Sequence, residues 1–240
     1  MDTPQTQIRQ KIALPQNTFS QQPNLIDTLF RWSIKNRNRI IFVFKLYYYL
    51  LILLTIAGSF SAYYLDKNFL FFYDLALWSG KIGLTFYVLT VIPGVARRFG
   101  IKHKVISLLM IFRRYTGISM YLGVFAHFMV IRGTLYIRQM RIVWPMPTFE
   151  LLSLTALVLT TFLFLTSNDY SVFRLKKLWN KVHQLTYVII WLIAFHVLLQ
   201  RISVWSILIS TAVVLQVASY IYSRFIRSTP VTNTSSPQSK

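Results

Sequence analysis

The chain has no cysteine among its 240 residues. Without thiolates it cannot form disulfides, a thiol relay, thiolate-ligated haem or an iron–sulfur cluster. It also lacks the glycine-rich strand-to-helix motif of a nucleotide-binding fold. If this protein moves electrons, haem or flavin must carry them, and another protein or a bound small carrier must supply them.

Acidic residues are scarce as well, because six Asp and Glu stand against 26 Lys and Arg, for a net charge of +20. A nucleic-acid-binding protein would gather such cations on one soluble face, whereas here they lie between apolar runs. Hydrophobic residues make up 55% of the chain and aromatic residues 16%. This composition is typical of integral membrane proteins.

Six apolar runs approach the length of about 20 residues that crosses the hydrocarbon core of a bilayer. The predicted fold is an all-α integral membrane protein, a six-transmembrane-helix bundle within residues 39–224. A polar segment, 1–38, precedes it, with a short interfacial helix expected over 25–34, and a disordered tail, 225–240, follows. The spans are expected at about 40–64, 78–96, 113–131, 148–166, 183–200 and 203–223.

The basic residues also predict how the bundle is oriented. Nineteen of the 26 fall on one side of the predicted spans and five on the other, while Lys45 and Lys81 lie inside spans. Lys and Arg accumulate in cytoplasmic loops of membrane proteins. We therefore expect both termini in the cytoplasm.

Three of the four histidines lie within apolar runs, where ionisable residues are costly. His127 and His196 come late in spans that both run outward, so they share a depth in the outer leaflet. We predict that they are the two axial ligands of one b-type haem, each donating its other ring N–H to an acceptor. The alternative is a hydrogen-bonding role between helices. His103 lies in a basic loop and is expected at the surface.

An arginine lies five residues beyond each outer histidine, at Arg132 and Arg201, where the spans reach water. These charges suit haem propionates, because guanidinium binds carboxylates well. Snorkelling of a long basic side chain at a helix end is the alternative interpretation.

His183 precedes His196 by 13 residues, which is roughly 20 Å along a helix. The same depth on the third span holds Arg113 and Arg114, and protonated guanidinium does not ligate iron. Two interpretations stay open. His183 ligates a second haem with water or another residue opposite, or it contacts a flavin or a propionate among the cations Arg113, Arg114, Lys181 and Lys81.

Three further residues are candidates for lining a cofactor near His183. Trp179 and Tyr187 lie four residues to either side of it, on one helical face. Gly117 has no side chain and so gives room for a macrocycle or for a neighbouring helix. Aromatic residues at this depth are also common in the interfacial belt of membrane proteins.

Residues 78–200 resemble the ferric-reductase-like transmembrane domain family, most closely its MsrQ (YedZ) group of haem-binding subunits of methionine sulfoxide reductase systems. The chain departs from that family at Leu175-Lys176, where Leu-Gly is common, and in its long basic N-terminal segment. The resemblance rests on an ordered set of residues: Gly80-Lys81, Arg113-Arg114-x-x-Gly117, His127, Thr166-Ser167, Leu175, Trp179, His183, Tyr187 and His196.

This resemblance implies a six-helix bundle in the inner membrane of a bacterium, with haem b on the three intramembrane histidines. It implies electron transfer from a cytosolic flavin reductase or a quinol to a periplasmic redox enzyme, which in that family is a molybdenum-cofactor protein that repairs oxidised methionine. Two alternatives remain. The protein reduces ferric iron or oxygen itself at the outer haem, or it is a haem-free scaffold or transporter.

Overall fold

The computed structural model describes residues 24–65, 67–139 and 145–226, and the regular secondary structure of these residues is entirely helical. Expectations about residues 1–23 and about the tail from 227 lie outside the described residues. Helices long and apolar enough to cross a membrane identify the chain as a multi-pass membrane protein. In the described residues these are α3 (Arg37–Tyr64), α4 (Phe69–Arg98), α7 (Thr148–Leu165), the paired α9 (Lys177–His183) and α10 (Thr186–Gln200), and α11 (Val204–Ile221) with its extension η2 (Tyr222–Ile226).

The predicted third span corresponds to α5 (Lys104–Phe128), which is not among the five apolar segments. It carries Arg113 and Arg114 near its middle and His127 near its end, which lowers its hydropathy. The helix continues through a π turn, η1 (Met129–Gly133), into α6 (Thr134–Gln139).

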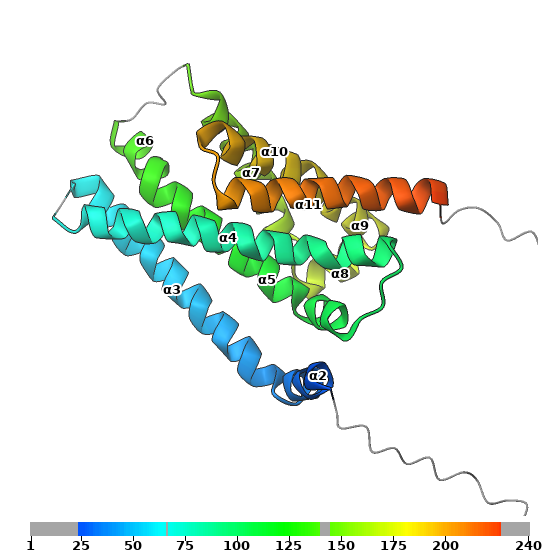
Figure 1. Ribbon diagram of the computed structural model, residues 1–240. Helices are drawn as coiled ribbons and strands as arrows, with labels where there is room; N and C mark the ends of the chain where they lie inside the picture. The colour runs from blue at the N-terminus through cyan, green and yellow to red at the C-terminus, as the bar shows by residue number, and fades with distance from the viewer. Residues whose placement is uncertain (1–23, 66, 140–144, 227–240) are drawn as a thin grey trace, which may run out of the picture.

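The long helices run back and forth between two ends of the bundle (Figure 1). One end holds the short helices α2 (Leu25–Lys35), α8 (Asp169–Leu175) and α9, and the other holds α6 and the link between α3 and α4. The helix α3 leans away from the others (Figure 1), and only 6% of its apolar stretch is buried. The chain therefore alternates between two ends, as a multi-pass protein must.

Several boundaries differ from the sequence prediction, whereas the short helix α2 lies where 25–34 predicts it. The third span was expected from residue 113, but α5 begins at Lys104. The second span was expected from residue 78, but α4 begins at Phe69. Its second turn carries the exposed Asp74, which does not interrupt the helix. The run 183–200 is broken at Gln184-Leu185, so His183 ends α9 instead of opening α10.

Helix α4 is the centre of the packed core. It contacts α5, α10 and α11 through buried apolar side chains, and the Tyr87 hydroxyl donates a hydrogen bond to the Thr186 carbonyl at 2.6 Å. Small residues let α4 and α5 approach closely, because a Cβ on Gly123 would lie 3.0 Å from the Ser79 carbonyl oxygen. This close contact fixes the position of His127 relative to α4.

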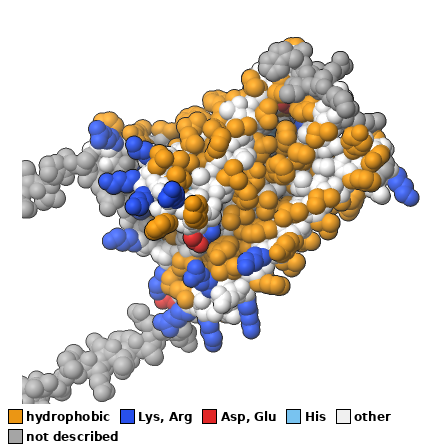
Figure 2. Space-filling view, turned by 180° about the vertical axis from the view of Figure 1, so that it is seen from behind, with side chains coloured by type: hydrophobic (Ala, Val, Ile, Leu, Met, Phe, Trp, Pro, Cys, Tyr) orange, Lys and Arg blue, Asp and Glu red, His pale blue; other side chains and the backbone are white. Residues whose placement is uncertain are grey.

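Apolar and basic side chains occupy different parts of the surface. Figure 2 shows apolar side chains over the middle of the molecule, with Lys and Arg side chains gathered mostly at the end where α2 and α8 lie. An apolar belt between polar ends is what a bilayer requires of a protein surface. The lipid bilayer is therefore the environment of this fold.

Lys176, between α8 and α9, has a backbone conformation that favours glycine. Its φ of 48° and ψ of −117° lie in a region that a residue with a Cβ rarely adopts. The local chain path thus calls for a glycine that this sequence does not have.

Candidate cofactor cavity

A cavity of about 590 Å³ lies among α4, α5, α7, α10 and the start of α11. This volume is within the range of roughly 300–1,000 Å³ that is typical of small-molecule and cofactor sites. Both His127, from α5, and His196, from α10, line it. The structure therefore brings together the two histidines that the sequence predicts at a common depth.

The ring of His127 is held against α4. Its Nδ1 lies 3.0 Å from the Ala76 carbonyl oxygen, which can only accept, so Nδ1 carries the proton and donates. Gly80, one turn after Ala76, makes this approach possible, because a Cβ there would lie 2.6 Å from Nδ1. The lone pair of Nε2 is then left for another partner.

The ring of His196 is held in the same manner against α7. Its Nδ1 donates to the Phe149 carbonyl oxygen at 2.7 Å, and the small residue Ser153 follows one turn later. In the described part of the chain neither His127 nor His196 makes a hydrogen bond through Nε2. Histidines that ligate metals are commonly oriented by such an N–H bond to a backbone carbonyl.

Arg132 and Arg201 line the same cavity as the histidines that they follow by five residues. In a regular α-helix, a residue five positions on points roughly 140° away. The π turn η1 widens the helix after His127 and returns Arg132 toward the cavity. On the other side α10 ends at Gln200, and Arg201 adopts an extended backbone.

Glu150, the chain's only glutamate, lines the cavity beside Phe149. Its carboxylate accepts from Arg132 Nη2 at 2.8 Å and from the Tyr136 hydroxyl at 2.6 Å. Partial burial, followed by the hydrogen bond to Glu150, raises the pKa of Tyr136 to about 12, so the phenol remains a donor. Sequence reasoning did not single out Glu150, although its uniqueness at the start of an apolar run was a visible signal.

Lys81 belongs to this cavity, which corrects the expectation that it surrounds His183. Lys81 follows Gly80, which packs against the His127 ring, and so Lys81 lies beside the same cavity. The ammonium lies 4.3 Å from the centre of the Trp78 ring, a cation–π contact. Lys81, Arg132 and Arg201 together make the cavity wall basic.

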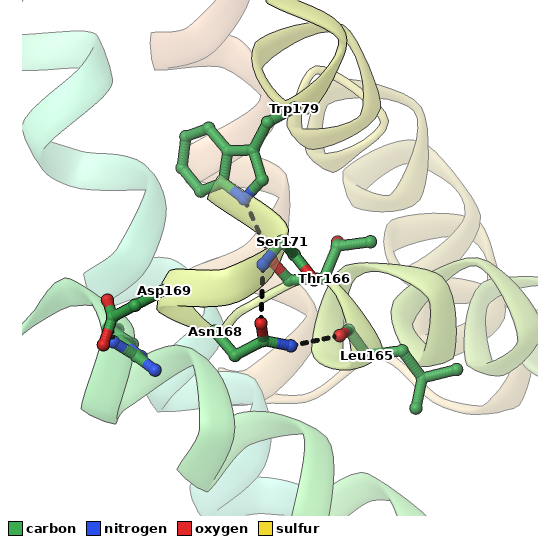
Figure 3. A network of polar contacts seen from close by, with 7 residues as sticks. Leu165, Thr166, Asn168, Asp169, Ser171 and Trp179 are labelled. Carbon is green, nitrogen blue, oxygen red and sulfur yellow. Dashed lines mark hydrogen bonds and ion pairs between the residues drawn. The ribbon is translucent and has the colours of Figure 1, made fainter. Parts of the chain in front are cut away.

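His183 lies at a different place, near the end of the bundle that holds α8 and α9. The Trp179 ring stacks on its imidazole with centroids 3.9 Å apart, and His183 Nδ1 lies 3.1 Å from the Trp179 carbonyl oxygen. Trp179 is itself fixed, because its indole N–H donates to the Thr166 carbonyl at 2.9 Å (Figure 3). These contacts join Thr166, Trp179 and His183, which are three of the residues on which the family resemblance rests.

The two adjacent arginines of α5, Arg113 and Arg114, have different partners. Arg113 lies within electrostatic range of His183 and Tyr187, whereas Arg114 forms an ion pair with Asp169 at 2.7 Å. Asn168, which precedes Asp169, caps α8 through a bond from the Ser171 N–H (Figure 3). Arg114 is therefore engaged at the surface, and Arg113 is the cation nearer the histidine.

Tyr187 and Gly117 both lie beside α4. Because the chain breaks at Gln184-Leu185, Tyr187 turns toward α4, where the Arg98 guanidinium lies 4.4 Å from its ring centre. A Cβ on Gly117 would meet only Thr90 Cγ2, at 4.0 Å. Arg113 lies within electrostatic range of both His183 and Tyr187.

The fold and the site define a helical multi-pass membrane protein with a basic internal cavity that holds two imidazoles. In the described ranges no group of three or more His, Asp or Glu side chains is placed to hold a metal ion. Comparison of the chain with protein-family models, with curated proteins and with solved structures found no match.

Proposed function

We propose that the protein binds haem b between His127 and His196 and carries electrons across the membrane. The observation that supports this most is the matched orientation of the two rings. Each comes from a different helix, lines the same cavity and is held through Nδ1 by a backbone carbonyl. Both Nε2 atoms are then available as iron ligands in the neutral imidazole form.

The other residues of the cavity fit the same group. Bound haem supplies a one-electron carrier, and its propionates require cations or water. Arg132, Arg201 and Lys81 provide three positive charges on the cavity wall. Glu150 already pairs with Arg132, so its carboxylate competes with a haem propionate for this guanidinium. The propionates are therefore stabilised better beside the other cations of the wall.

A second redox cofactor at His183 extends the path toward the opposite end. The Trp179 ring stacks on the His183 ring and fixes it. The contact of His183 Nδ1 with a backbone carbonyl leaves its Nε2 free, as it does for His127 and His196. Either a second haem or a flavin suits this position, since Arg113 is close enough to balance a propionate or a phosphate.

We place α5 as the sixth crossing, with both termini in the cytoplasm of a bacterium and His127 and His196 toward the periplasm. The packing of α5 against α3, α4 and α7 and the basic end of the bundle support this orientation. In this arrangement a cytosolic flavin reductase or a quinol donates electrons, and a periplasmic redox enzyme accepts them, as in the resembled methionine sulfoxide reductase systems.

The test is the haem content of histidine variants of the purified protein. We expect His127→Leu and His196→Leu each to lose the outer haem, because one axial ligand remains. His103→Leu is the matched control, since His103 is exposed at the start of α5 and its Nδ1 accepts from the Val105 N–H. Full haem content in either outer variant would contradict the ligand pairing.

The alternatives predict different results. A self-contained reductase would reduce ferric iron or oxygen in the absence of any periplasmic protein, whereas a conduit requires its acceptor. A haem-free scaffold would be colourless even when haem is supplied during expression. If His183→Leu removes about half of the haem, the second site is a haem site.

A further inference from the structure

A second, smaller cavity of about 310 Å³ lies where α2 meets α5, away from the histidines. It is lined by Ser33, Ile34, Arg37, Ile111 and Phe112. Phe112 precedes His127 by 15 residues, which is roughly 20 Å along α5 at 1.5 Å per residue. The two cavities are therefore separate sites.

The polar groups of this small cavity lack protein partners. Ser33 is only 7% exposed, yet its hydroxyl makes no hydrogen bond with any described residue. Arg37 has no acidic partner within the described ranges either, while nearby Asp27 is engaged by Lys104. The Ser33 hydroxyl is open to the cavity, so water or a polar group of a ligand can reach it.

The remaining walls of the cavity are apolar. Ile34, Ile111 and the buried ring of Phe112 form them, so the cavity combines a cation, a hydroxyl and hydrocarbon. The position also fits a bilayer surface, because α2 is seen almost end on at the foot of α3 (Figure 1). Its axis therefore crosses that of the spanning helix steeply, and its exposed apolar side chains include Leu29 and Trp32.

We infer that this cavity binds one anionic phospholipid, with the phosphate on Arg37 and Ser33 and an acyl chain along Ile34, Ile111 and Phe112. The charge of the surrounding end favours an anionic headgroup over a zwitterionic one, since Arg31, Lys35 and Arg39 lie on the same two helices. Asp27 and Lys104 tie α2 to α5 and keep the cavity formed. This inference does not depend on haem binding.

The experiment titrates the purified full chain in detergent with phosphatidylglycerol or with phosphatidylcholine of the same acyl chains, and it follows the melting temperature. We expect saturable stabilisation by phosphatidylglycerol and a weaker effect of phosphatidylcholine. Arg37→Gln should weaken phosphatidylglycerol binding roughly tenfold, which corresponds to about 1.4 kcal/mol. Arg31→Gln is the matched control, because Arg31, on α2, is also exposed but does not line the cavity.

A second variant separates a built site from general attraction to anionic lipid. Ser33→Leu fills the cavity and keeps every charge, so it should abolish saturable binding while haem content and gel-filtration profile stay as in the wild type. Equal weakening in Arg37→Gln and Arg31→Gln would overturn the inference, since surface charge alone would then explain binding. Equal stabilisation by the two lipids, or unchanged binding in Ser33→Leu, would overturn it as well.

Discussion

At the scale of single residues, the missing side chain of Gly80 decides how His127 is held. A Cβ at this position would lie 2.6 Å from the imidazole Nδ1, too close for any side chain without moving the ring. Gly80→Ala should therefore break the bond to the Ala76 carbonyl and lower haem affinity roughly 10–100-fold, the usual loss for a partner that orients a ligand. Haem titration of the apoprotein measures this.

Gly117→Ala is the control for this prediction. Its new Cβ would make only an ordinary contact with Thr90 Cγ2, at 4.0 Å, so haem affinity should match that of the wild type. If Gly80→Ala bound haem as tightly as Gly117→Ala, the orientation of His127 by α4 would not matter for the cofactor.

Lys176 gives a second residue-scale prediction, about stability. Its left-handed backbone stores strain on the order of 1–3 kcal/mol, and the added flexibility of glycine in the unfolded chain costs about 0.5–1 kcal/mol. Lys176→Gly should therefore stabilise the protein by about 1 kcal/mol and raise the melting temperature by roughly 2–4 °C. Lys176→Ala keeps a Cβ, and an equal gain in that variant would refute the explanation by backbone strain.

The sequence predicted some contacts of single residues and could not predict others. The lining of one cavity by His127 and His196 follows from their depth in two parallel runs, which hydropathy reveals. Their backbone acceptors at Ala76 and Phe149 could not be predicted, because every residue has a carbonyl and the sequence does not show which one accepts. Glu150 was missed because one acidic residue at the edge of an apolar run is ambiguous without its partner Arg132.

At the scale of helices, departures from regular geometry bring the cavity residues together. The π turn after α5 and the end of α10 each return an arginine to the cavity, although regular helices would turn both away. The break at Gln184-Leu185 separates α9, which ends at His183, from α10, which carries Tyr187. Periodicity alone assumes unbroken helices, which is why the sequence placed His183 at the start of a span and not at the end of α9.

The proposed sixth crossing is tested directly by site-specific labelling, since the natural chain has no cysteine to interfere. Single cysteines at Lys102 and at Pro145 lie on the links before and after the continuous helix that contains α5. If α5 spans the bilayer, a membrane-impermeant maleimide added to intact cells should label Pro145→Cys and should reach Lys102→Cys only after lysis. Labelling of both, or of neither, in intact cells would show that α5 does not cross.

At the scale of the whole molecule, the bundle combines an apolar belt, one strongly basic end and an internal cavity with two imidazoles. In the proposed function, the basic end faces the cytoplasm, and the two imidazoles ligate haem iron within a wall that carries three cations. Hydropathy and charge predicted the membrane class because both depend on composition along the chain. The volume of the cavity could not be predicted, since it depends on how five helices pack.

The central claim is tested most directly by the reduced-minus-oxidised visible spectrum of the purified wild-type protein, with haem counted per polypeptide. We expect a low-spin b-type spectrum, with one haem if His127 and His196 form the single site and close to two if His183 also ligates haem. A protein that remains colourless after expression with abundant haem would contradict the proposed electron transfer and favour a membrane scaffold or transporter.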